Sequence, residues 1–182
     1  MSDNGLSLTK KIAGSAIFAG LAYVVSFLEF SIFPAADFLK MDFSSVFTLL
    51  AGFIYGPIFG VIVCAVKSLL FFTKMGGGGP IGVLTDFILS LSFVVMPTTV
   101  YRYRKGIKTV ILTLIGACLI QTAVSLLVNR FISFPVYMGS SAGAVFNSLW
   151  YYIVAFNIIK TVTVSLITVL LYKRVSYLIK KL

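Results

Sequence analysis

An apolar run near the C-terminus, WYYIVAFNIIKTVTVSLITVLLY (residues 150–172), contains a single charged side chain, Lys160. A helix needs about 20 predominantly apolar residues to cross the hydrocarbon core of a bilayer. The run is long enough to do so, and it therefore predicts a membrane-spanning helix.

The rest of the chain has the same character. Of its 182 residues, 59% are hydrophobic and 11% are charged, whereas soluble domains average about 45–50% and about 25%. Five further apolar runs precede the run at residues 150–172. They lie at residues 8–28, 43–55, 58–72, 81–101 and 109–131. Irregular segments are expected at residues 29–42 and 133–149. Six helices of about 20 residues use about 120 residues. We therefore expect an all-α integral membrane protein with six transmembrane helices, formed as one membrane-embedded domain over residues 1–182.

Charged residues are distributed unevenly, with 15 Lys and Arg, 5 Asp and Glu and no His. Most of the basic residues lie in three short clusters beside apolar runs, at Lys10–Lys11, Arg102–Lys108 and Lys173–Lys181. Six spans place all three clusters on one side, and basic loops of membrane proteins stay in the cytoplasm. The sequence therefore predicts cytoplasmic N- and C-termini. Short clusters without a soluble scaffold argue against nucleic-acid binding.

Few residues could support catalysis. Because His is absent, metal centres and His-dependent triads are poorly supplied, and Cys64 and Cys118 have no C-x-x-C spacing. The glycines at 76–79 lead into Pro80 rather than into the Lys of a phosphate-binding loop. We interpret them as a flexible external loop, and we expect no ATP hydrolysis by this chain alone, no enzyme activity and no cofactor.

Polar side chains inside the apolar runs are candidate ligand contacts, because such groups are unfavourable in lipid and mark sites. Asn157 and Lys160 are three residues apart and share one helix face. Asn129 lies near the external end of the fifth run, and Lys67 and Asp86 lie in the third and fourth. The alternative is structural: a buried Lys–Asp pair, such as Lys160 with Asp86, holds the bundle together.

Small side chains form a face on the first run. The pairs are Ser15 with Ala19 and Ala16 with Gly20, each four residues apart. Such faces allow another helix to approach closely. They indicate either packing within the bundle or docking of a separate subunit.

Four stretches carry a family resemblance: FLKMDFS (residues 38–44), YGP (55–57) followed by Gly60, Asn129 with PVY (135–137), and FNIIK (156–160). In order and spacing they resemble the substrate-binding S components of energy-coupling factor (ECF) vitamin transporters. Within that family they are most similar to the riboflavin-specific member. The resemblance covers nearly the whole chain.

The resemblance implies a six-helix protein of a prokaryotic plasma membrane that binds riboflavin near its external face. It also implies partners, a transmembrane scaffold subunit and two ATPases, and a subunit that tips over in the membrane on docking. By position, the flavin would be bound by Asn129, Asn157 and Lys160 beneath a covering loop that includes Leu39, Lys40 and Asp42. The scaffold would contact the small face formed by Ser15, Ala16, Ala19 and Gly20.

One departure from the family pattern bears on the ligand. Asp86 occupies what looks like an Asn position, which leaves a modified flavin or related ring open. An S component for folate, pantothenate or thiamine is an alternative of the same class. A stand-alone membrane facilitator and a membrane scaffold without a ligand are alternatives of other classes.

Overall fold

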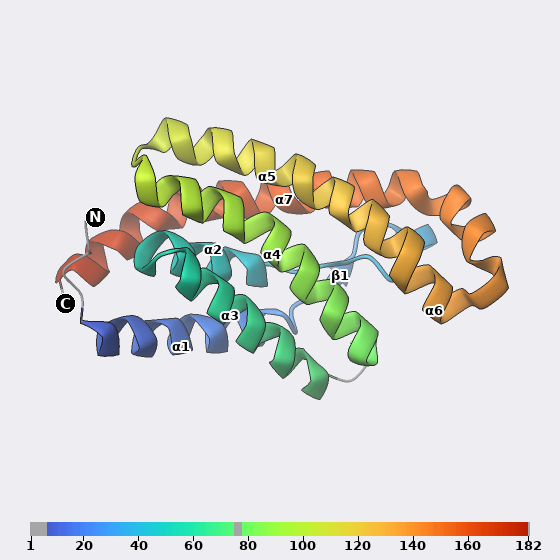
Figure 1. The fold of residues 1–182 in the computed structure, drawn as a ribbon, viewed down its shortest axis with the longest axis horizontal. Helices are drawn as coiled ribbons and strands as arrows, with labels where there is room; N and C mark the ends of the chain where they lie inside the picture. The colour runs from blue at the N-terminus through green and yellow to red at the C-terminus, as the bar shows by residue number, and fades with distance from the viewer. Residues whose placement is uncertain (1–6, 75–77, 182) are drawn as a thin grey trace.

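The computed structural model describes residues 7–74 and 78–181, with side chains described as far as Tyr172. Long helices lie side by side in an elongated bundle, and the start of α1 and the end of α7 lie at the same end of it (Figure 1). The helices of the bundle are α1 (Leu8–Val25), α2 (Ser44–Tyr55), α3 (Pro57–Leu70), α4 (Gly79–Tyr103), α5 (Ile107–Val128), α6 (Phe134–Met138) and α7 (Ala142–Lys181).

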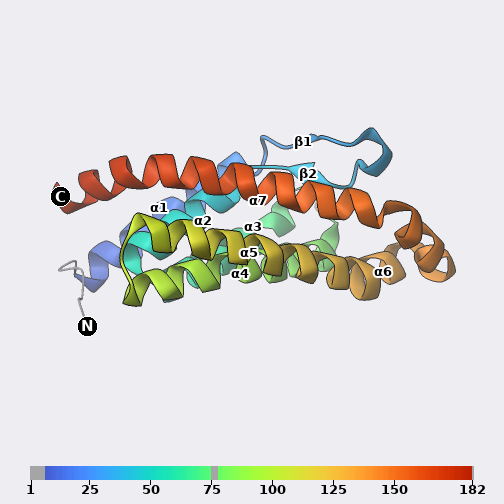
Figure 2. The same cartoon turned by 90° about the horizontal axis from the view of Figure 1, so that it is seen from above.

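The segment between α1 and α2 is a short ordered loop. Two-residue strands β1 (Phe30–Ser31) and β2 (Lys40–Met41) pair antiparallel, with Phe30 opposite Met41, and a 3₁₀ turn η1 (Pro34–Ala36) lies between them. Figure 2 shows this hairpin beside α7. The irregular segment predicted at residues 29–42 therefore covers one side of the bundle.

Close packing of α2 on its neighbours depends on glycine. A Cβ at Gly52 would lie 2.4 Å from Cγ2 of Thr98 on α4, and a Cβ at Gly60 would lie 3.0 Å from Cα of Gly52. Gly56 separates α2 from α3 with φ of 108°, a conformation that favours glycine. Pro57 then opens α3, where its missing N–H is not needed.

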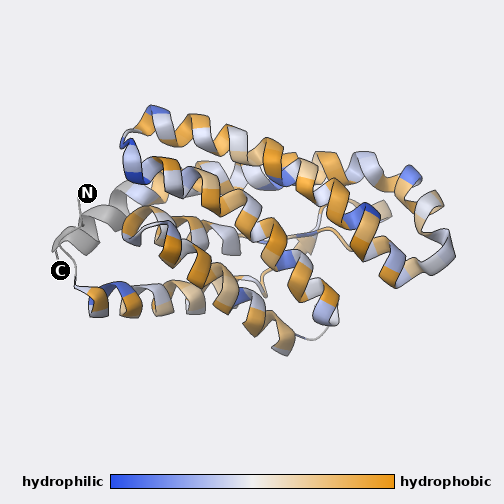
Figure 3. Cartoon of the chain, in the orientation of Figure 1, coloured by the Kyte–Doolittle hydropathy of each residue, from blue (hydrophilic) through white to orange (hydrophobic). Residues whose placement is uncertain are grey.

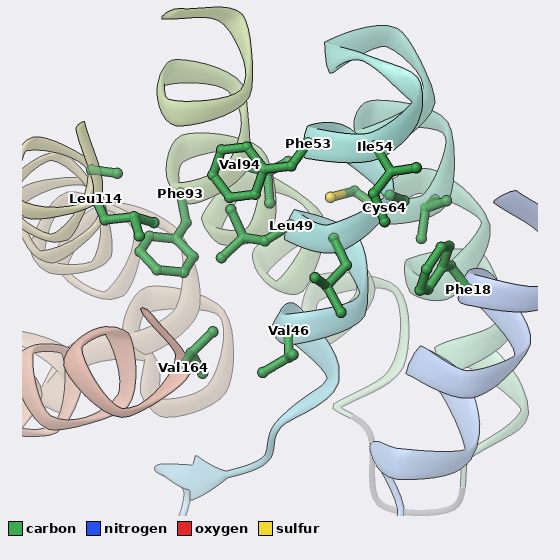
Figure 4. Close-up of a cluster of buried hydrophobic side chains, with 14 of the residues drawn as sticks. Phe18, Val46, Leu49, Phe53, Ile54, Cys64, Phe93, Val94, Leu114 and Val164 are labelled. Carbon is green, nitrogen blue, oxygen red and sulfur yellow. The ribbon is translucent and has the colours of Figure 1, made fainter. Parts of the chain in front are cut away.

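Two apolar clusters form the interior. The larger joins α1, α2, α3, α4, α5 and α7, and Figure 4 shows Leu49, Phe93 and Val164 meeting in it. The smaller joins the hairpin loop to α6 and α7 through Leu39, Met41 and Phe156, among others. The second cluster holds the loop against α7 and so positions its polar residues.

The helices are rich in apolar residues, as the hydropathy colouring in Figure 3 shows, and many large apolar residues are exposed. Large side chains on α5 and α7 are exposed, including Leu112 at 68%, Leu119 at 67% and Leu170 at 73%. Soluble monomers rarely expose large contiguous apolar patches, whereas a bilayer accommodates them. This surface confirms the prediction of an apolar helical protein that is not an ordinary soluble domain.

Within the part of the chain that the structure describes, length and composition allow three helical segments to cross a membrane. They are Leu8–Val25, Gly79–Tyr103 and the long segment Ile107–Tyr172, which contains both α5 and most of α7. The segments Ser44–Tyr55 and Pro57–Thr73 are shorter apolar helices; the second includes a 3₁₀ turn, η2 (Phe71–Thr73).

The loop predicted at residues 133–149 is wrong. A π-helical turn η3 (Asn129–Ser133) continues α5 into α6, a 3₁₀ turn η4 (Gly139–Ser141) follows, and α7 begins at Ala142. The physical reason is burial: Phe134 and Ala142 pack in the smaller cluster, so this segment is helical and held on the bundle. The glycine loop predicted at 76–79 lies partly outside the described residues, as do the side chains of Lys173–Lys181.

Candidate ligand-binding site

A small cavity of about 60 Å³ lies inside the bundle between four helices. Its lining combines polar side chains with two apolar ones, Leu89 and Phe156. The full lining is Ser45 from α2, Asp86, Leu89 and Ser90 from α4, Gln121 from α5, and Phe156, Asn157 and Lys160 from α7. Polar side chains from four separate helices thus meet in the otherwise apolar interior of the bundle.

Lys160 lies at the edge of the cavity and pairs with Asp42 from the hairpin loop. The Lys160 Nζ donates to Asp42 Oδ2 at 2.7 Å, and the two side chains are only 17% and 13% exposed. The other carboxylate oxygen accepts from the backbone N–H of Ser44 at 2.8 Å and from its hydroxyl. The proposed pairing of Lys160 with Asp86 is therefore wrong.

The charge state of Asp42 follows from these neighbours. Burial alone raises the pKa of its carboxyl, but the charges of Lys160 and Lys67 and the hydrogen bonds from Lys160 and Ser44 lower it further than burial raises it. The pKa of Asp42 is therefore well below its ordinary value. Asp42 is ionised at neutral pH, and it connects the loop to α7 as a charged contact.

Asp86 has a different partner, because α3 lies against α4 at this depth. Lys67 Nζ donates to Asp86 Oδ1 at 2.7 Å, and the Ser68 hydroxyl donates to Oδ2 at 2.6 Å. Lys67 is 2% exposed and Asp86 21%. This is the structural Lys–Asp pair that the sequence suggested, with Lys67 in place of Lys160.

The two predicted asparagines share a partner on α5. The Asn157 amide donates to Ser125 Oγ at 2.9 Å and to the Ile153 carbonyl at 2.8 Å. The Asn129 amide donates to the Ser125 carbonyl at 2.8 Å. Asn157 lines the cavity, whereas Asn129 is not in its lining and is linked to it through Ser125. The structure thus brings Asn157 and Lys160 together, with Asn129 one contact away.

The three predicted loop residues lie in different environments. Leu39 is buried in the smaller apolar cluster with Phe156. Lys40 is not in the cavity lining and pairs with Asp37 at 3.2 Å, in a contact whose side chains are 40% and 71% exposed. Of the three, Asp42 is the one that forms an ion pair with a cavity residue, Lys160.

Sequence reasoning did not identify Gln121, Ser45, Ser90, Leu89 or Phe156 as lining residues. Gln121 could have been found by the rule that selected Asn157, because it is a polar side chain inside an apolar run. The serines carry a weak signal, because serine is common at helix contacts in membranes.

The small face on α1 is divided between interior and surface. Ser15 and Ala19 are buried at 4% and 3% exposure, so they pack within the chain. Ala16 and Gly20 are exposed, and a Cβ at Gly20 would meet nothing within 4 Å. A second helix could therefore approach at Ala16 and Gly20.

Comparison with known proteins identifies the family. The family model described as "ECF transporter, substrate-specific component" matches residues 10–172. A protein named riboflavin transporter RibU from Staphylococcus aureus (strain TCH60) is 33% identical over 178 residues, covering 95% of this chain and 94% of that protein. Riboflavin transporter FmnP from Bacillus subtilis (strain 168) is 26% identical, covering 90% of each chain.

A solved structure of the S component of a bacterial ECF transporter superposes with a TM-score of 0.83. It is 31% identical and covers 96% of this chain and 99% of that one. The fold, the family model and the relatives therefore agree on a transporter family rather than an enzyme family. The chain belongs to the family of substrate-specific S components of ECF transporters.

Proposed function

We propose that this chain is a high-affinity riboflavin-binding S component, which captures the vitamin outside the cell and delivers it inward. The observation that carries the proposal is the convergence of Asn157, Lys160 and Asp42 at a buried cavity in an apolar bundle. The 33% identity to a riboflavin transporter across 95% of the chain supports the choice of vitamin.

The chemistry of this cavity suits a flavin. An uncharged tricyclic ring fits apolar walls such as Leu89 and Phe156, and its polar edge requires a few donors and acceptors in fixed positions. Asn157 offers an acceptor, because both N–H groups of its amide donate to Ser125 and Ile153. Lys160 has three N–H donors, one of which is directed to Asp42. Two donors of Lys160 are then available to carbonyl or hydroxyl oxygens of the ligand.

The size of the cavity implies that the loop moves when ligand binds. Sites for small molecules typically measure about 300–1,000 Å³, several times the 60 Å³ present. The hairpin loop with Leu39, Lys40 and Asp42 covers this side of the bundle and contacts α7 through Asp42. We infer that riboflavin is admitted when this loop shifts outward, and that the enlarged site then extends to Asn129, which is linked to Asn157 through Ser125.

The arrangement in the membrane is part of the proposal. Six spans with both termini in the cytoplasm would place all three basic clusters inside, as the positive-inside rule requires. The start of α1 and the end of α7 lie at one end of the bundle, which supports their being on the same side of the membrane (Figure 1). The membrane would then be the plasma membrane of a prokaryote, with the hairpin loop at the external end.

Delivery requires partners. By its family, the chain would work with a transmembrane scaffold subunit and two ATPases, and the vitamin is its cargo rather than a cofactor. Ala16 and Gly20 on the exposed side of α1 would contact the scaffold, while Ser15 and Ala19 support that helix from inside.

The decisive experiment is a visible absorption spectrum of the protein purified in detergent from cells grown in rich medium. A stoichiometric flavin spectrum, lost on denaturation and filtration, is expected. A colourless protein that also fails to quench added riboflavin fluorescence would refute the flavin assignment. A binding panel with folate, pantothenate and thiamine would then identify a different cargo. Vitamin flux in liposomes without partners would instead indicate a stand-alone facilitator.

A further inference from the structure

Gln121 has an unsatisfied acceptor in the wall of the cavity. Its side chain is 6% exposed, and its Oε1 has no hydrogen-bond partner among the residues that the structure describes. Its Nε2 donates to Asn157 Oδ1 across a long 3.5 Å contact. Both residues line the cavity, so two side-chain amides lie next to each other there.

A buried carbonyl oxygen without a donor needs an explanation, because nearly all such groups in native proteins are paired. Within the described residues, the one other unpaired buried side-chain atom is Ser15 Oγ on α1, outside the cavity lining. Gln121 therefore combines an unused acceptor with a position in the cavity wall. A ligand donor at this position would satisfy it.

The surroundings indicate which ligand donor that is. Leu89 and Phe156 provide apolar wall beside the amides, which suits a flat ring better than a polyhydroxylated tail. The oxidised isoalloxazine ring has one N–H, the imide at N3, between two carbonyl groups. A primary amide matches such an edge, because it can accept from the N–H and donate to a neighbouring carbonyl at once.

Resting on the proposed function, we infer that Gln121 is a specificity-determining contact whose Oε1 accepts a hydrogen bond from the imide N–H of the flavin ring. The Nε2 of Gln121 then faces a ring carbonyl while Asn157 and Lys160 supply the remaining polar contacts. A ring that lacks this N–H would leave the buried acceptor unpaired, and the site rejects it for that reason.

The test combines one change in the protein with one change in the ligand, in the manner of a double-mutant cycle. Dissociation constants for riboflavin and N3-methylriboflavin are measured by quenching of flavin fluorescence, using the full chain and its Gln121→Met variant. We expect the native protein to bind the methylated ligand at least about 10-fold more weakly, the equivalent of one hydrogen bond. In Gln121→Met, which keeps the side-chain length without the acceptor, this ratio should fall several-fold.

A neighbouring substitution serves as the control. Thr122 is on α5, 9% exposed and outside the cavity lining, with its hydroxyl bonded to the Cys118 carbonyl of its own helix. Thr122→Val makes a similar polar-to-apolar change and should keep the native ratio. Thermal unfolding verifies that both variants fold, and Gln121→Leu replaces Gln121→Met if the latter does not.

Three outcomes would overturn the inference. One is an unchanged ratio in a folded Gln121 variant that still binds riboflavin. Another is a loss of riboflavin affinity that disappears when the ligand is lumiflavin, which has the ring without the hydroxylated tail, because this assigns Gln121 to the tail. A native protein that binds neither flavin refutes the proposed function and the inference with it.

Discussion

Substitutions in the ion pair between Lys160 and Asp42 can measure its role in ligand binding separately from its role in stability. Lys160→Ala removes a donor proposed to contact the flavin and leaves the Asp42 carboxylate without its cation. A hydrogen bond to a charged group contributes about 1.5–3 kcal/mol, which corresponds to about 10- to 150-fold in the dissociation constant for riboflavin. We expect weakening in this range.

The same substitution also affects folding. Removing one partner of a buried ion pair typically costs about 3–5 kcal/mol. Here both side chains retain some exposure, and Ser44 still donates to Asp42 through its backbone N–H at 2.8 Å and through its hydroxyl. The free energy of unfolding of the ligand-free protein should therefore decrease by about 2–3 kcal/mol, somewhat below the usual range.

A second substitution distinguishes the two effects. Asp42→Asn in the Lys160→Ala background removes the uncompensated charge, so it should restore most of the thermal stability of the ligand-free protein. It cannot restore the lost ammonium donors, so riboflavin affinity should stay low. Fluorescence quenching and thermal unfolding in detergent measure the two quantities separately. Unchanged affinity in Lys160→Ala, or recovery of affinity together with stability, would refute a ligand-contacting role for Lys160.

Four other perturbations test the same structure. Because the pKa of Asp42 is lowered, its ion pair with Lys160 is fully present above the ordinary carboxyl pKa of about 4 and is lost only as the pH falls through the lowered pKa. Riboflavin affinity should therefore be constant from pH 8 to 5. Weaker binding within that interval would contradict an ionised Asp42 in the folded protein. Lys67→Met should destabilise the protein by about 2–3 kcal/mol, because it removes the cation beside Asp86 and leaves the Ser68 hydroxyl as its donor. Adding Asp86→Asn should recover most of the loss in a thermal melt. Gly52→Ala places a methyl group 2.4 Å from a Thr98 carbon and should cost about 1–3 kcal/mol, whereas Gly20→Ala, which meets no atom within 4 Å, should leave the melting temperature unchanged. Gly20→Leu should lower riboflavin uptake by cells that express the energising subunits without changing the affinity of the isolated chain, and normal uptake would exclude this part of α1 from docking.

The sequence predicted the helices well because their signal is local. An apolar run identifies itself by composition, so the predicted run at residues 43–55 and the observed α2 at Ser44–Tyr55 nearly coincide. The first part of α7, residues 142–149, was predicted as loop because its sequence is only weakly apolar. It is helical because Phe134 and Ala142 pack in a cluster formed by distant residues, which local composition does not reveal.

The sequence identified individual residues of the site but not the partners with which they pair. Asn157 and Lys160 were identified from their depth in an apolar run, and both line the cavity. The partner of Lys160 depends on where the hairpin loop crosses α7, and that is fixed by packing of Leu39 and Met41 in the smaller cluster. No property of the isolated run at residues 150–172 distinguishes Asp42 from Asp86 as this partner.

The two ion pairs together bear on the cargo. Lys160 with Asp42 and Lys67 with Asp86 each sum to zero charge, and the charge of Lys67 also acts on Asp42, so the pairs are electrostatically connected. The acidic side chain at position 86 therefore adds no net charge to the site, because Lys67 neutralises it. A site with balanced charges, enclosed by low-dielectric walls, admits a neutral ligand without leaving a buried charge unpaired. Folate and pantothenate carry carboxylates and thiamine carries a cationic ring, so each would need an opposite charge in the site. The charges of these two pairs already neutralise each other and leave none for the ligand. The charge balance thus favours a neutral flavin independently of the hydrogen-bonding groups.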